Sequence, residues 1–132
     1  MDNQQELMFK LQMFEQQMQQ IQQQMQAVER AIVEMNSLNF GLDDLVGKKD
    51  KEILAPIGRG IFTKAKLISE ELIVDIGGKN FVTKSIPQTK KLIQGQIKKL
   101  NEVQRELGEN LEQIGEEFNN MIMEAQKGEE GK

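Results

Sequence analysis

Few residues of this chain are of the types that carry out catalysis. Its 132 residues include no histidine and no cysteine, which removes the commonest general base, the commonest transition-metal ligand and thiolate chemistry. Glu70-Glu71 and Glu116-Glu117 are paired carboxylates, but neighbours on one turn or one helix do not enclose a substrate or a water. We therefore predict solvated charge at both pairs, and a protein that is not an enzyme and has no catalytic residue, metal site or cofactor.

Two glycine-rich segments have some likeness to phosphate-binding loops. Gly58-Arg59-Gly60 lies between two predicted strands, so it lacks the helix start that such a loop needs, and Gly77-Gly78-Lys79-Asn80 has the same setting. Both are predicted to be hairpin turns. A formal net charge of −4 also argues against nucleic acid as a partner, because surfaces that bind phosphates normally carry a basic excess.

The compartment is predicted from what the sequence lacks. No run of about 18 apolar residues occurs, and no basic and apolar leader opens the chain, so we expect no membrane association. The absence of cysteine fits a reducing compartment. A soluble cytoplasmic protein is expected.

Two long segments have the residue spacing of coiled-coil helices. Intervals of four and three alternate between apolar residues, which is the seam of a coiled coil, so we predict helices over residues 1–46 and 86–126. Residues 127–132 are predicted to form a flexible tail. The first seam comprises Leu7, Leu11, Phe14, Met18, Ile21, Met25, Val28, Ile32 and Met35, and continues past Asn39 to Leu42 and Val46. The second comprises Ile93, Ile97, Leu100, Gln104, Leu107, Leu111, Ile114, Phe118, Met121 and Ala125.

The two helices are expected to pair with each other in an antiparallel coiled coil. One register aligns the two seams throughout, so that Phe14 faces Phe118 and Ile32 faces Leu100. Continued along the helices, this register sets Val46 against Ile86. Ser85-Ile86-Pro87-Gln88 is predicted to be a capping box that starts the second helix.

The segment between the helices, residues 47–85, is predicted to form two consecutive β-hairpins. Short runs of β-branched and aromatic residues alternate with tight turns, over Glu52–Ile57, Ile61–Ile68, Leu72–Ile76 and Phe81–Ser85. Sheets this small are marginal without more strands or a covering layer. The hairpins therefore need partners.

A cluster of apolar residues near both termini is not explained by the seams. Met8, Phe9, Met13, Ile122 and Met123 lie at positions where a coiled coil of this kind normally has polar groups. The antiparallel register brings them to one end of the coiled coil, far from the hairpins. Exposed apolar clusters usually mark interaction sites, and methionine suits a surface that adapts to many partners. We predict a promiscuous apolar binding surface there.

The order of helix, two hairpins and helix resembles the alpha class of the prefoldin family, since the beta class has only one hairpin. EILAPIGRGIFTKAKL, residues 52–67, is similar to the first hairpin of the family, in which Pro, an aliphatic residue and Gly precede a small turn and an aromatic. LIVDIGGKNFVTKS, residues 72–85, is similar to the second. The fold implied is α+β and mainly helical: a long antiparallel two-helix coiled coil whose two β-hairpins, at its closed end, join a β-barrel between subunits.

The resemblance implies a subunit of a chaperone that holds unfolded proteins without ATP. Two alpha and four prefoldin beta subunits would form a hexamer that delivers non-native proteins to a group II chaperonin. Residues implied to bind unfolded protein are Met8, Phe9, Met13, Phe14, Phe118, Met121, Ile122 and Met123. Residues implied to act in oligomerisation are Ile53, Ile57, Ile61, Phe62, Leu72, Val74, Ile76 and Phe81.

A second interpretation stays open. The chain could be a structural coiled-coil oligomerisation or adaptor module, whose apolar end docks one dedicated partner. The breadth of binding separates the two: a holdase suppresses aggregation of several unrelated unfolded proteins, and an adaptor does not.

Overall fold

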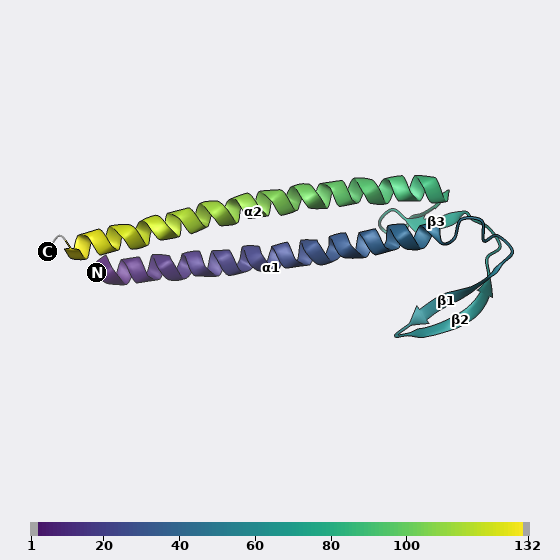
Figure 1. Cartoon of the computed structure of the whole chain (residues 1–132), viewed down its shortest axis with the longest axis horizontal. Coiled ribbons are helices and arrows are strands. Elements are labelled where there is room, and N and C mark those ends of the chain that lie inside the picture. The colour runs from purple at the N-terminus through teal and green to yellow at the C-terminus, as the bar shows by residue number, and fades with distance from the viewer. Residues whose placement is uncertain (1–2, 131–132) are drawn as a thin grey trace. The chain divides into compact units, whose positions relative to one another are not determined.

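The computed structural model describes residues 3–130 and contains two long helices and two β-hairpins (Figure 1). The elements follow the predicted order, and the mainly helical α+β fold is confirmed. They are α1 (Asn3–Asp43), β1 (Glu52–Gly58), β2 (Ile61–Lys66), β3 (Leu72–Asp75), β4 (Phe81–Lys84) and α2 (Ile86–Glu130). Contacts within the chain divide it into two units. The helical unit combines α1 up to Ile32 with α2 from Lys99, and the hairpin unit comprises residues 33–98.

In the helical unit, the seam residues of both helices are partly buried from solvent. From Leu7 to Ile32 every seam residue of α1 is partly buried, and so is every seam residue of α2 from Leu100 to Ala125. A Cβ atom added to Gly108 would lie 4.0 Å from Cε of Met25. This contact is within one residue of the predicted antiparallel register, in which Gly108 faces Gln24.

The hairpin unit has a small apolar core between its helices. Leu42, Ile86 and Ile93 are buried, and the residues packed around them are Met35, Leu45, Leu72 and Ile97. These side chains come from the end of α1, the start of α2 and strand β3. Their packing holds the three elements together, because burial of apolar surface is the main stabilising term in folding. Lys90 of α2 also forms an ion pair with Asp43 of α1.

The predicted capping box starts α2. The backbone N–H of Gln88 donates to Oγ of Ser85 over 3.2 Å, and the backbone N–H of Ser85 donates to Oε1 of Gln88 over 3.1 Å. Thr89 adds a third bond, from its hydroxyl to the Ser85 carbonyl over 2.9 Å. These bonds satisfy backbone groups that a helix start otherwise leaves unpaired.

The end of α1 differs from the prediction. The helix stops at Asp43 rather than at Val46, because the N–H groups of Leu45 and Val46 each donate to the carbonyl three residues back, which tightens the last turn. Gly47 then adopts a left-handed φ of 75°. In this tighter turn Leu45 packs on the core, and Val46, which the seam placed inside, is exposed.

The end of α2 also differs. The helix runs to Glu130, so the predicted tail at 127–132 begins inside it, and residues 131–132 lie outside the described residues. Lys127 lies in the last turn, where a positive charge is favourable at the negative end of the helix dipole. No proline interrupts the segment.

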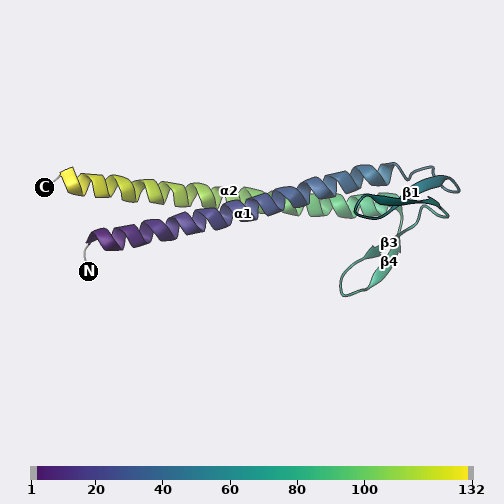
Figure 2. The ribbon, with the colours of Figure 1, turned by 90° about the horizontal axis from the view of Figure 1, so that it is seen from below.

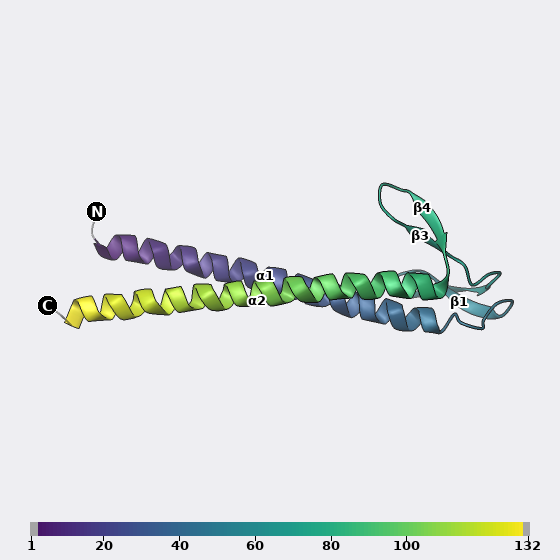
Figure 3. The ribbon, with the colours of Figure 1, turned by 90° about the horizontal axis from the view of Figure 1, so that it is seen from above.

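Each hairpin is a separate antiparallel sheet of two strands. Figure 2 and Figure 3 show strands β3 and β4 side by side, away from β1. Glu52 pairs with Lys66 in the first hairpin, and Leu72 pairs with Lys84 in the second. The register of the first shifts between Pro56 and Gly58, so the proline, which has no N–H to donate, lies beside an irregularity in the ladder. Strand β2 ends at Lys66, two residues before the predicted Ile68.

Replacement of glycines inside α2 should stabilise the fold. No atom lies within 4 Å of a Cβ built on Gly95 or Gly115, and both have helical backbone. Gly95→Ala and Gly115→Ala should each add about 0.5–1 kcal/mol to the free energy of unfolding, because alanine favours helix over glycine. Thermal melts followed by circular dichroism measure this. Gly78→Ala is the control and should lower the melting temperature, because φ is 60° there. Lower melting temperatures for the two α2 variants would contradict the account.

Candidate functional site

Apolar side chains are exposed at the start of α1 and near the end of α2. We call Met8, Phe9, Met13, Phe14, Phe118, Met121, Ile122 and Met123 the tip cluster. The solvent-exposed fractions of Met8 and Met123 are 63% and 59%, and Phe9 and Met13 are exposed as well. Ile122 and the three seam members are partly buried. Two methionines and one phenylalanine of α1, and one methionine of α2, thus stay exposed within the helical unit.

A groove between the two helices joins members of the tip cluster. It is lined by Met13 and Phe14 of α1 and by Met121 of α2, and its volume is about 500 Å³. The polar lining comes from Lys10, Gln17 and Glu124. The structure therefore brings tip-cluster residues of α1 and α2 together in one groove, as the antiparallel register requires. A groove of this size admits side chains of an extended chain, and its lining offers them both apolar and charged contacts.

A second apolar surface lies on the hairpins. Five of the eight residues predicted to act in oligomerisation are exposed: Ile57, Ile61, Phe62, Ile76 and Phe81. The other three, Ile53, Leu72 and Val74, are partly buried within the chain. Leu72 packs against the core of Leu42, Ile86 and Ile93, so it stabilises the chain's own fold.

Sequence reasoning missed three exposed residues of this second surface. Ile73 is 77% exposed, and Leu54 and Ile68 are exposed as well. Leu54 and Ile73 alternate along their strands with partly buried neighbours. Apolar residues on both faces of a strand are the signal that predicts them, because such a strand needs cover on both sides. We call these three residues and the five exposed ones above the hairpin surface.

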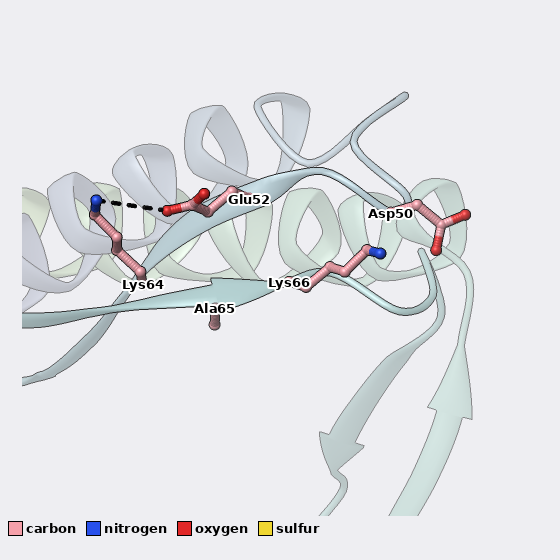
Figure 4. Close-up of a pocket in the computed structure, with 5 residues that line it drawn as sticks. All are labelled: Asp50, Glu52, Lys64, Ala65 and Lys66. Carbon is pink, nitrogen blue, oxygen red and sulfur yellow. Dashed lines mark ion pairs between the residues drawn. The ribbon is translucent and has the colours of Figure 1, made fainter.

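The charged residues around the hairpins form no catalytic arrangement. Figure 4 shows Glu52 and Lys64 pointing toward each other across the β1–β2 pair, with Asp50, Ala65 and Lys66 nearby. Nζ of Lys64 lies 3.8 Å from Oε1 of Glu52, and both side chains are largely exposed. The ion pair therefore contributes little to stability. Glu70, of the Glu70-Glu71 pair, has a structural role, since its Oε1 accepts a hydrogen bond from the backbone N–H of Gly47 over 2.6 Å.

Among residues 3–127, whose side chains the structure describes, no three acidic groups gather closely enough to hold a metal ion. Neither α1 nor α2, over the described residues 3–130, is apolar enough along its length to cross a membrane.

Comparisons with known proteins agree with this architecture. The family model described as prefoldin subunit matches residues 14–129. The chain is 31% identical over 123 residues to a protein named prefoldin subunit alpha from Methanobrevibacter smithii, a match that covers 92% of this chain and 84% of the relative. A cryo-EM structure of filamentous PFD from Methanocaldococcus jannaschii superposes with a TM-score of 0.76 at 17% identity, covering 86% of this chain and 95% of that one. Met8, Phe9 and Met13 precede the range that the family model matches.

Proposed function

Because this chain belongs to the prefoldin family of chaperone subunits, we propose that it is a cytoplasmic holdase subunit that captures non-native proteins without ATP. The observation that carries the proposal is the tip cluster. Its exposed members occupy positions that the coiled-coil seam does not need, and both helices contribute to it. Exposed apolar clusters of this kind usually mark interaction sites.

The side chains of the tip cluster suit capture of many different chains. Met8, Met13 and Met123 have flexible, polarizable side chains that adapt to irregular apolar surfaces. Helical backbone groups are bonded within the helices, so contact with a client depends on side chains rather than on a fixed backbone pattern. Such contacts select for exposed apolar surface, which folded proteins bury and non-native proteins present.

The hairpin surface supports an assembly role for residues 47–85. Each sheet has only two strands, and a pair of that kind is marginal alone, so added strands from other subunits would complete it. We propose that the hairpins join a β-barrel between subunits in a hexamer of two alpha and four beta subunits. Delivery of bound proteins to a group II chaperonin is part of the same proposal and rests on the family alone.

Polar substitution of the tip cluster tests the holdase. Phe9→Ser, Met13→Ser, Ile122→Ser and Met123→Ser together should reduce holding several-fold and leave helicity unchanged, because their side chains lie off the seam. Light scattering of several unrelated unfolded proteins, diluted into buffer without ATP, measures holding. The chain should be assayed alone and with a prefoldin beta subunit.

Val33→Ser with Val103→Ser is the matched control, since both valines are exposed on the helices outside the tip cluster. This control should hold unfolded proteins as well as the unchanged chain does. Suppression for one protein only would favour the adaptor. Equal suppression by the tip variant and the unchanged chain would contradict the proposed site.

Substitution of the hairpin surface tests assembly. Ile57→Ser, Phe62→Ser and Phe81→Ser should prevent complexes with a prefoldin beta subunit. These three side chains are exposed in the single chain, and burial of such apolar side chains between subunits stabilises an interface. Analytical ultracentrifugation of the mixed subunits measures the mass. The tip variant described above is the control and should assemble normally. A hairpin variant that assembles like the unchanged chain would contradict the assigned role.

A further inference from the structure

Charge is distributed unevenly between the two helices of the helical unit. From residue 102 to residue 124, α2 contains seven glutamates and a single basic residue, Arg105, which forms an ion pair with Glu109 over 3.2 Å. In α1, no residue from Gln16 to Val28 is charged. The net charge of −4 for the whole chain therefore conceals one strongly acidic stretch of α2, residues 102–124, whose seven glutamates and one arginine give a net charge of −6.

The glutamates of α2 lie together on its solvent side. With 3.6 residues per turn, they fall within about 140° of the helix circumference, opposite the seam. All are exposed, and we call them the acidic face: Glu102, Glu106, Glu109, Glu112, Glu116, Glu117 and Glu124. Like charges at this spacing repel one another along a helix, so the acidic face costs some stability.

The acidic face reaches the tip cluster. Glu117 precedes Phe118, Glu124 follows Met123, and Glu124 also lines the apolar groove. The basic residues nearest the cluster in sequence are Lys10, which lines the same groove, and Lys127. Against these two stand Glu6, Glu15, Glu116, Glu117 and Glu124, so the surroundings of the cluster are acidic overall.

We propose that the tip cluster selects non-native segments in which lysine or arginine flanks apolar side chains. This inference rests on the proposed function, because it names the class of client that the same site prefers. The groove takes the apolar side chains, and the acidic face beside it attracts the flanking cations. Complementary charge at the rim of an apolar site contributes specificity and association rate.

Screening by salt limits the attraction of client lysine and arginine side chains to the glutamates nearest the tip cluster. The Debye length is about 8 Å at physiological ionic strength, and a helix rises about 1.5 Å per residue. Glu117 and Glu124 lie within about 6 Å of Met121 along the axis, whereas Glu102, Glu106 and Glu109 lie about 18–29 Å away. The near glutamates should therefore determine the preference, and the far ones should contribute little at equilibrium.

Three labelled peptides with the same leucine and phenylalanine residues test the proposal. One has flanking lysines, one flanking glutamates and one flanking serines, and fluorescence anisotropy measures their binding to the full chain. We expect the lysine peptide to bind about fivefold or more tightly than the glutamate peptide at low salt, since each exposed charge pair contributes modestly. The ratio should approach one in 0.5 M salt, where the Debye length is about 4 Å.

Two triple variants with the same change in charge locate the effect. Glu116→Gln, Glu117→Gln and Glu124→Gln should abolish the preference, and Glu102→Gln, Glu106→Gln and Glu109→Gln should leave most of it. Equal binding of the lysine and glutamate peptides to the unchanged chain would overturn the proposal, as would an equal loss of preference in both variants. Serine substitution of Met13 and Met123 tests the proposed holding site separately from its preference for charge. If it leaves binding of the serine peptide intact, the proposed function itself is wrong.

Discussion

Packing of the α1 seam against the α2 seam is the interaction on which the rest of the structure depends. Neither helix is expected to be stable alone, since α2 contains three glycines before Phe118 and helices in proteins owe most of their stability to the packing of an apolar face. Mutual burial of the seams supplies the missing stability. It also brings Met13 and Met121, which are far apart in sequence, to one groove. Without antiparallel pairing there is no tip cluster.

Apolar surface is left uncovered in two places, and the two differ in what they can bind. Strands β1 to β4 present backbone N–H and C=O groups at their edges, and these directional groups favour a fixed partner strand. Helices have satisfied such groups internally, so the tip cluster offers only side chains. One fold thus combines a surface suited to defined subunits with a surface suited to variable clients. The acidic face of α2 then adds a preference among those clients.

Local patterns predicted the helices, the hairpins and their turns, because heptads, strand-forming runs and glycine turns are set by neighbouring residues. Local patterns did not predict which residues are buried where tertiary packing determines burial. The turn after Asp43 tightens so that Leu45 reaches the core, and the heptad alone placed Val46 there. Leu72 and Ile73 are neighbours of equal hydrophobicity, yet Leu72 packs on the chain's own core and Ile73 is exposed. Which face of a strand is covered depends on helices remote in sequence.

Site-specific photocrosslinking tests the division between the two surfaces most directly. A benzophenone amino acid at Phe9, and another at Phe62, would be activated in the assembled protein with a radiolabelled unfolded client present. The account predicts crosslinks from position 9 to the client and from position 62 to neighbouring subunits. Client crosslinks that arise from position 62, with none from position 9, would contradict it, because the hairpins would then be the surface that holds non-native protein.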